Sequence, residues 1–203
     1  MQVTKLCRVI ALTVLLLVGC GREEGLRPLA ADAVILAFGD SLTFGTGAGR
    51  NESYPKVLER LTGRTVVNAG VPGEVTAKGL TRLPGLLGKH QPDLVVLIHG
   101  GNDMLRRHSR AQAANNLRSM IGLARNSGAD AVLLGVPAPG LILSTASFYE
   151  EVAEETATPI DSDARAGILQ YPSNKSDPVH PNGKGYRMLA GAVRELLTEH
   201  GAL

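Results

Sequence analysis

Short apolar runs alternate with longer amphipathic stretches along most of the chain. The short runs are rich in valine, leucine and isoleucine and lack polar alternation, as expected of parallel strands that are covered on both faces. Between them, apolar residues recur at the three- and four-residue spacing of a helix. This alternation predicts right-handed crossovers and a three-layer α/β sandwich. The predicted strands are residues 34–38, 65–67, 94–98 and 131–136.

Helices are predicted between and after these strands, and two of them have recognisable starts. Ser53 is placed to cap the first helix, with Pro55 in its first turn. The last helix begins near Asn182-Gly183 and continues to Glu199, with apolar residues at i, i+3, i+4 and i+7. Two further helices are expected over residues 76–87 and 110–126, and residues 137–175 have the weakest pattern.

The first 32 residues differ from this pattern and are predicted to lie outside the domain. Lys5 and Arg8 precede an apolar run over residues 9–18, which ends in Leu17-Val18-Gly19-Cys20. A basic start, about ten apolar residues and small residues before a cleavage point are typical of a secretory signal, which is too short to span a bilayer. The ending resembles the lipobox of bacterial lipoproteins, in which the cysteine is acylated; an ordinary signal peptide with an incidental cysteine is the alternative. We therefore expect a signal peptide over 1–19, lipidated Cys20 and a flexible tether over 20–32, and one domain over 33–203.

Cleavage at this point changes the charge of the chain. The full sequence has 21 basic and 19 acidic side chains, and removing Lys5 and Arg8 leaves 19 of each. A neutral chain without a basic run gives no reason to expect a nucleic-acid partner. Cys7 would be lost with the signal and Cys20 lipidated, so no cysteine remains for a disulfide. The expected location is a bacterial membrane, with the lipid as anchor and the domain facing the periplasm.

Glycine and small polar side chains follow three of the predicted strands. The exits are Gly39-Asp40-Ser41-Leu42, the stretch from Asn68 to Gly73, and His99-Gly100-Gly101-Asn102-Asp103. The carboxyl ends of parallel strands meet at one edge of a sheet, where ligands bind, so these segments are expected to lie together. One such exit is typical of an ordinary turn, whereas three together indicate a site.

A fourth segment carries a carboxylate and an imidazole directly before the last helix. Asp177 is followed by Pro178, and His180 by Pro181, and each proline disfavours helix at the residue before it. An acyl-transfer site needs a hydroxyl, an imidazole to take its proton, a carboxylate to orient the imidazole, and donors for the oxyanion. These four segments contain all of those groups.

The blocks Gly39-Asp40-Ser41-Leu42, Gly73, Gly100-Gly101-Asn102-Asp103 and Asp177-Pro178-Val179-His180 stand in this order along the chain. Together they resemble the motifs of the GDSL, or SGNH, hydrolase family. VVNAGVPGE, LTRLPGLLGKHQPD and GGNDML resemble its bacterial thioesterase, lysophospholipase and arylesterase branch. The resemblance implies a flavodoxin-like fold with a parallel sheet of about five strands. It also implies a serine esterase or thioesterase that hydrolyses lysophospholipid, fatty acyl or aryl esters through an acyl-enzyme.

The same resemblance implies roles for individual residues. Ser41 would be the nucleophile, His180 the general base and then acid, and Asp177 the group that orients His180. The oxyanion hole would consist of the backbone N–H groups of Ser41 and Gly73 and the side-chain amide of Asn102.

Other residues near these motifs have less specific roles. Asp40 and Asp103 are expected to be structural, Asp40 by holding the nucleophile turn through local hydrogen bonds. His99 lies at a strand exit and is a candidate pocket residue. Leu141 and Ile142 are candidates for one wall of an acyl groove, or equally for core residues at the start of a helix.

Neither a cofactor nor a metal ion is expected. Gly45-Thr46-Gly47-Ala48-Gly49 has the spacing G-x-G-x-G and lacks the acidic residue of a dinucleotide site. Asp161-Ser162-Asp163 resembles the start of a calcium loop, but Pro172 stands at the twelfth position, where a glutamate belongs.

Aromatic content of 3%, with no tryptophan, disfavours a sugar-stacking platform and favours an aliphatic acyl pocket. The expected partner is a small-molecule acyl ester or lipid. The sequence is also compatible with two alternatives. One is a carbohydrate O-acetyl esterase with the same machinery, and the other is a non-catalytic, membrane-tethered binding lipoprotein.

Overall fold

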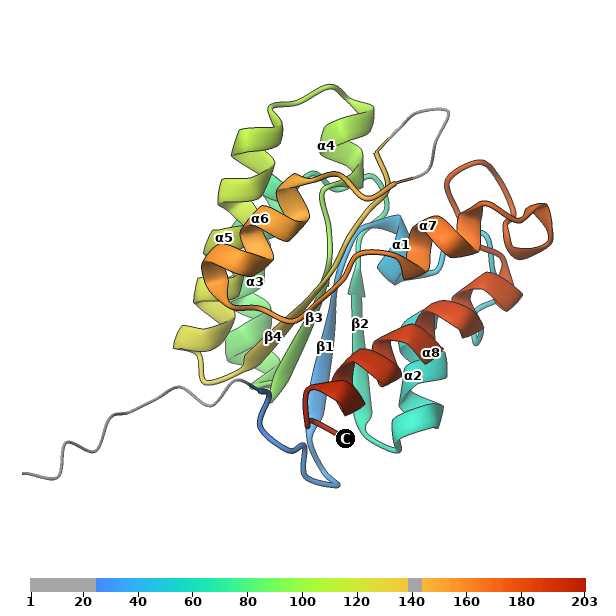
Figure 1. The fold of residues 1–203 in the computed structure, drawn as a ribbon. Helices are drawn as coiled ribbons and strands as arrows, with labels where there is room; N and C mark the ends of the chain where they lie inside the picture. Colours follow the sequence, from blue (N-terminus) through green and yellow to red (C-terminus); the bar gives the residue numbers. More distant parts are fainter. Residues whose placement is uncertain (1–24, 139–143) are drawn as a thin grey trace, which may run out of the picture.

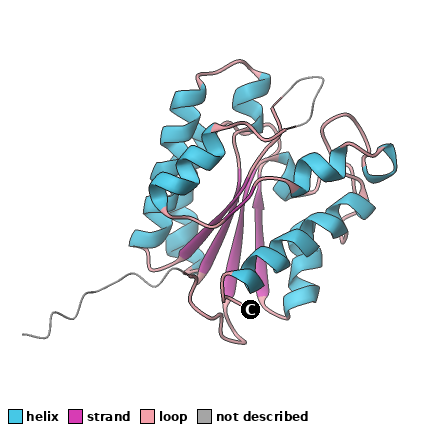
Figure 2. Cartoon of the chain, viewed as in Figure 1, coloured by secondary structure: helices cyan, strands magenta, loops and turns pink. Residues whose placement is uncertain are grey.

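The computed structural model describes residues 25–138 and 144–203. In these residues a parallel five-stranded sheet lies between two layers of helices (Figures 1 and 2). The strand order is β2-β1-β3-β4-β5, which is the flavodoxin-like order. The predicted α/β sandwich and its strand number are therefore confirmed. The strands are β1 (Val34–Gly39), β2 (Thr65–Gly70), β3 (Leu94–Ile98), β4 (Asp130–Leu134) and β5 (Ile160–Asp161).

Helices α2 and α8 cover one face of the sheet, and α3, α5 and α6 cover the other (Figure 1). In the described residues, no helix is both long and apolar enough to cross a membrane. The predicted helix over 110–126 is observed with the same bounds, and α6 and α7 lie in the stretch whose pattern was weakest. The helices are α1 (Ser41–Phe44), α2 (Tyr54–Thr62), α3 (Thr76–His90), α4 (Gly101–Leu105), α5 (Arg110–Asn126), α6 (Phe148–Thr156), α7 (Ala164–Leu169) and α8 (Gly183–Glu199), with a 3₁₀ turn at Pro172–Asn174.

The carboxyl ends of β2 and β4 differ from the prediction by more than one residue. Strand β2 continues through polar Asn68, because this edge strand leaves that side chain exposed and able to donate to the Phe44 carbonyl at 3.3 Å. Strand β4 ends before Gly135, whose N–H bonds the Asp161 carbonyl at 2.8 Å. The longer β2 brings Gly70 level with Gly39, so both strands end at the same height in the sheet.

The core lies on both faces of the sheet and explains the apolar patterns. All five residues of β3 are fully buried. The predicted apolar stripe of α8 is buried along its length, and Tyr186 and Leu189 in it are completely inaccessible. Burying one large apolar side chain stabilises the fold by roughly 1.5–3 kcal/mol. Leu61 of α2, by contrast, is 42% exposed.

The predicted flexible tether is wrong for residues 25–32. The N–H of Leu26 bonds the His200 carbonyl at 2.8 Å, and that of Leu29 bonds the Ala202 carbonyl at 2.9 Å. Leu29 is buried, and Arg27 pairs with Asp130 at 3.0 Å. Residues 25–32 therefore pack along the end of α8 as part of the domain. Two leucines among polar residues gave no periodic pattern, and the carbonyls that their N–H groups bond lie more than 100 residues away.

Candidate active site

The turn after β1 presents Ser41 as the first residue of a short helix. Gly39 is the last residue of β1, and a methyl group on it would lie 2.0 Å from the Ile98 carbonyl oxygen, so only glycine allows this approach. The buried carboxylate of Asp40 caps α1, because its Oδ1 accepts from the Leu42 N–H at 3.1 Å. The predicted local structural role of Asp40 agrees with this contact. The turn leaves the Ser41 hydroxyl at the carboxyl edge of the sheet.

Ser41, His180 and Asp177 lie in one hydrogen-bonded chain. The Nε2 atom of His180 is 2.9 Å from Ser41 Oγ, and its Nδ1 is 2.7 Å from Asp177 Oδ2. A carboxylate can only accept, so Nδ1 carries a proton and the neutral ring has its lone pair on Nε2, facing the hydroxyl. Ser41 and His180 are 139 residues apart in the sequence.

The Asp177 carboxylate is held by its own loop. Its Oδ1 accepts from the N–H groups of Val179 and His180 at 2.9 and 2.8 Å, which leaves Oδ2 for the imidazole. Partial burial raises the pKa of Asp177, but the hydrogen bonds from Val179 and His180 outweigh this and lower the pKa below its usual value. Asp177 is therefore ionised at neutral pH.

Donors for an oxyanion lie in the same cavity as Ser41. Gly73 and Asn102 line this cavity together with Ser41 and His180. Among the described residues, the N–H groups of Ser41 and Gly73 have no hydrogen-bond acceptor. Gly73 has φ of +76°, a conformation that favours glycine. Two backbone donors without an acceptor and a side-chain amide therefore lie in the residues around one cavity, as an oxyanion hole requires.

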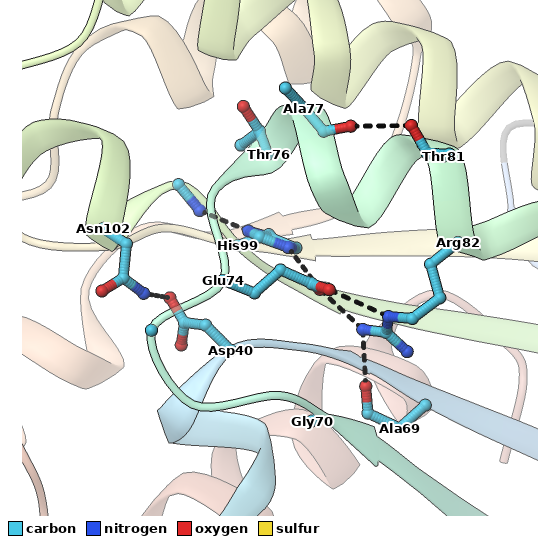
Figure 3. A network of polar contacts seen from close by, with 12 residues as sticks. Asp40, Ala69, Gly70, Glu74, Thr76, Ala77, Thr81, Arg82, His99 and Asn102 are labelled. Atoms are coloured by element: carbon cyan, nitrogen blue, oxygen red, sulfur yellow. Dashed lines mark hydrogen bonds and ion pairs between the residues drawn. The ribbon is translucent and has the colours of Figure 1, made fainter.

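Asp40 also orients Asn102. The Nδ2 atom of Asn102 donates to Asp40 Oδ2 at 3.0 Å, and the amide keeps a second N–H for another acceptor. Burial raises the pKa of Asp40. One buried carboxyl thus bonds both the turn that carries Ser41 and the Asn102 amide. Figure 3 shows its contact with Asn102.

The cavity has a volume of about 340 Å³ and a mainly apolar lining. The apolar part of this lining suits an aliphatic chain, because contact with it buries apolar surface. Leu141 and Ile142, the predicted groove residues, lie outside the described residues. The apolar side chains of the lining are Leu42, Pro72, Leu105, Val136, Pro137, Ala138, Leu169, Pro178 and Val179.

His99 does not line the cavity, so its prediction as a pocket residue is wrong. Its side chain is fully buried beside α3, where its Nε2 lies 3.2 Å from Glu74 Oε2. Its Nδ1 accepts from the Gly100 N–H at 3.0 Å, so the proton is on Nε2 and is donated to Glu74. A Cβ atom on Gly79 of α3 would lie 2.4 Å from His99 Nε2, so the His99 ring packs directly against α3.

The ion-pair network around Glu74 was not predicted from the sequence. Arg82 donates to Glu74 from Nε at 3.0 Å and from Nη2 at 2.7 Å, and Nη2 also bonds the Ala69 carbonyl at 3.0 Å (Figure 3). Burial raises the pKa of Glu74, but the hydrogen bonds from His99 and Arg82 outweigh it and lower the pKa to about 2. Because Glu74 follows Gly73 directly, this network anchors the segment that carries one candidate oxyanion donor.

Asp103 anchors the other end of that segment. Its Oδ2 accepts from the Thr76 N–H at 2.9 Å, and its Oδ1 from the Thr76 hydroxyl at 2.8 Å. Asn116 Nδ2 donates to the same hydroxyl at 2.9 Å. Asp103 thus caps α3 from a different helix, and its predicted structural role agrees with these contacts.

Sequence reasoning also missed Arg165, a cation in the cavity lining. Arg165 belongs to α7, and the residue is only 4% exposed. Nothing in the sequence distinguishes it from a surface arginine. Within the described parts of the chain, no cluster of three or more histidine, cysteine, aspartate or glutamate side chains is arranged to hold a metal ion.

The chain is similar to known hydrolases in sequence and structure. The model of the family described as GDSL-like Lipase/Acylhydrolase matches residues 37–188. Esterase TesA of Pseudomonas aeruginosa is 39% identical over 130 residues, which cover 62% of this chain and 65% of that protein. Thioesterase 1/protease 1/lysophospholipase L1 of Escherichia coli K12 is 31% identical, covering 77% of this chain and 78% of that protein. A crystal structure of TesA aligns with a TM-score of 0.74 at 30% identity, over 82% of this chain and 98% of that one.

Proposed function

This chain belongs to the GDSL-like lipase/acylhydrolase family, and from that membership we propose that it is a serine hydrolase of acyl esters and thioesters that works through an acyl-enzyme. The observation that carries the proposal is the 2.9 Å contact between Ser41 Oγ and His180 Nε2, with Asp177 2.7 Å from the other ring nitrogen. This arrangement activates a serine, because the imidazole can take its proton as it attacks.

Acylation uses the proton positions derived above. His180 Nε2 takes the proton of Ser41 as Oγ attacks the substrate carbonyl carbon. The imidazolium that forms is stabilised by the ionised carboxylate of Asp177. His180 then gives the proton to the leaving oxygen or sulfur, the carbon–oxygen or carbon–sulfur bond breaks, and the acyl group stays on Ser41.

The oxyanion of the tetrahedral intermediate would be held by the N–H groups of Ser41 and Gly73 and by the Asn102 amide. These donors are fixed before the reaction, so they stabilise the developing charge without reorganising. Water then attacks the acyl-enzyme with His180 as base, and the carboxylic acid leaves as Ser41 regains its proton.

The proposed substrate is an ester or thioester with an aliphatic acyl chain. The cavity beside Ser41 has a mainly apolar lining and a volume of about 340 Å³, and an acetyl group alone would leave most of it unfilled. The similar E. coli protein is named a thioesterase and a lysophospholipase. Long-chain acyl thioesters and lysophospholipids are therefore the substrate classes we propose.

We further propose that the protein is exported and lipidated on Cys20, with the domain facing the periplasm. The support is the sequence of the leader, with Lys5 and Arg8 before an apolar run and Leu17-Val18-Gly19-Cys20 at its end. The full chain and its Cys20→Ala variant would be expressed with an alkyne fatty acid and fractionated. Lipidation at Cys20 predicts label and membrane association for the wild type and neither for Cys20→Ala. The same result for both proteins would contradict it.

The proposed activity is tested on Ser41 directly. The purified domain should react with a fluorophosphonate probe and hydrolyse p-nitrophenyl butyrate, whereas Ser41→Ala should do neither. Ser109→Ala is a matched control, since Ser109 is an exposed serine that caps α5 and is not among the residues that line the cavity. Equal labelling of wild type and Ser41→Ala would refute the assignment.

A further inference from the structure

A buried guanidinium forms part of the cavity lining. Arg165 is 4% exposed, and its Nε and Nη1 atoms are buried without a hydrogen-bond partner. An arginine side chain carries five N–H donors and cannot lose its charge under ordinary conditions. Burying a cation without hydrogen bonds is costly, so this side chain requires a partner that supplies acceptors.

The described residues do not supply that partner. No hydrogen bond or close ion pair joins the Arg165 side chain to any of them. The carboxylate that acts on it electrostatically is Asp40, which favours the charged guanidinium, although burial still lowers the pKa of Arg165. The two oxygens of Asp40 already accept from the Leu42 N–H and from Asn102 Nδ2. Asp40 therefore offsets part of the charge and leaves the guanidinium donors unused.

Arg165 lines the same cavity as Ser41 and His180 and is the only arginine or lysine among the described lining residues. The rest of the wall is mostly apolar, so the interaction of this cation with an anion is little screened. A guanidinium binds carboxylate and phosphate groups in a bidentate manner.

From these observations we infer that Arg165 forms a subsite for an oxyanion group, a carboxylate or a phosphate, carried by the ester substrate. The inference rests on the proposed function, because it places the anion on the molecule that Ser41 attacks. The group would be on the acyl chain, as in the hemi-ester of a dicarboxylic acid, or on the leaving group, as in an acylglycerol phosphate. Both share the chemistry that the subsite recognises.

The first arm of the test compares two esters of equal chain length. Mono-p-nitrophenyl glutarate carries a terminal carboxylate, and p-nitrophenyl valerate does not. The measured quantity is the ratio of their kcat/KM values, for wild type, Arg165→Gln and Arg165→Lys at constant ionic strength. A charge-assisted pair predicts a ratio roughly tenfold or more lower in Arg165→Gln. Arg165→Lys should recover part of the ratio, since lysine keeps the positive charge but lacks the planar, bidentate geometry of the guanidinium.

The second arm places the anion on the leaving group. The ratio of kcat/KM for 1-hexanoylglycerol 3-phosphate over 1-hexanoylglycerol is measured below the concentrations at which either aggregates. The substrate pair whose kcat/KM ratio is lower in Arg165→Gln than in wild type shows whether the oxyanion is on the acyl chain or on the leaving group. Arg194→Gln, at an exposed position of α8, is the matched control and should leave both ratios unchanged.

A readout without turnover separates this inference from the proposed function. Wild-type protein should bind glutarate more tightly than glutaramide by titration calorimetry, and Arg165→Gln should lose that preference. Activity that survives Ser41→Ala would defeat the proposed function and leave this binding result standing. Equal ratios in wild type and Arg165→Gln in both arms would overturn the subsite. If Arg165→Gln does not fold, the wild type alone still tests the subsite. A tenfold or greater preference of the wild type for the uncharged ester in both substrate pairs would overturn it as well.

Discussion

Asp40 Oδ2 accepts a 3.0 Å hydrogen bond from Asn102 Nδ2, and the residue after Asp40 is the proposed nucleophile. The same carboxyl caps α1 through its other oxygen. Two segments that lie 62 positions apart are thereby held in one relative position. The placement of the Asn102 amide and that of the Ser41 hydroxyl thus depend on a single buried side chain.

Asp40→Asn should lower kcat more than it alters KM. The substituted amide can still cap α1 with its oxygen, but its NH₂ group would face the donating NH₂ group of Asn102. We expect a loss of about 1–3 kcal/mol in transition-state stabilisation. Kinetics on p-nitrophenyl butyrate measure it, and Asp93→Asn is the control, since Asp93 bonds the Val34 N–H at the opposite edge of the sheet. A wild-type kcat in Asp40→Asn would show that the contact does not position the amide.

Asn102→Ala should cost about 2.7–4 kcal/mol of transition-state stabilisation, the range found for loss of one oxyanion-hole donor. The loss should fall on kcat, because the donor acts on charge that develops during the reaction. Stopped-flow acylation with p-nitrophenyl butyrate measures it on the chemical step. A raised KM at unchanged kcat would instead assign Asn102 to ground-state binding.

Asp177→Asn should retain the loop and lose most of the activity. The amide oxygen can replace Oδ1 as acceptor for the N–H groups of Val179 and His180. Its NH₂ would then face His180 Nδ1 and favour the tautomer with the proton on Nε2, which cannot accept from Ser41. The drop in kcat should approach about 10⁴-fold by analogy with the same change in a serine protease. Wild-type turnover together with an unchanged circular dichroism spectrum would contradict this role.

Ionised Glu74 should stabilise the protein at neutral pH, and this stabilisation should be lost in acid. Its pKa is about 2 in the folded state against 4.5 for the ordinary side chain, so its contribution is fully present above pH 4.5 and is lost as the pH falls toward 2. The shift corresponds to a stabilisation on the order of 3 kcal/mol. Glu74→Gln should be less stable at pH 7 and should lose less stability between pH 4.5 and 2. Urea unfolding across this range measures both effects, and parallel curves for the two proteins would disprove the linkage.

The apolar cavity predicts a preference for longer acyl chains. In a p-nitrophenyl ester series, kcat/KM should rise from acetyl toward octanoyl, by about 0.8 kcal/mol for each buried CH₂ group until the cavity is filled. Shortening the side chain of Leu169, which lines the cavity, should shift the optimum to a longer chain. A sharp preference for acetyl would favour the carbohydrate O-acetyl esterase alternative.

The features that the sequence predicted are those with local signals. The bounds of α5 follow from apolar spacing, and the exits of β1 and β3 follow from glycine beside small polar residues. The family motif pointed to Ser41 and His180 although their contact spans the chain.

The features that escaped prediction depend on distant partners. Glu74 and His99 are paired through the packing of α3 on the sheet, so His99 could be placed at a strand exit but not on a face. Arg165 is buried because other elements pack around α7. The residues next to it in the sequence are typical of an exposed helix. Residues 25–32 pack against the far end of the chain, which no local pattern encodes.

The contacts of Leu26 and Leu29 with the end of α8 also determine how the molecule would be oriented at a surface. The chain enters the domain at the amino ends of the strands, and Ser41 lies at their carboxyl ends (Figure 1). Only four residues separate Cys20 from Gly25, a reach of at most about 18 Å even when fully extended. With acyl chains on Cys20, the opening of the cavity that contains Ser41 would face away from the bilayer. Lipid substrates would then have to arrive through the aqueous phase or from an opposing membrane.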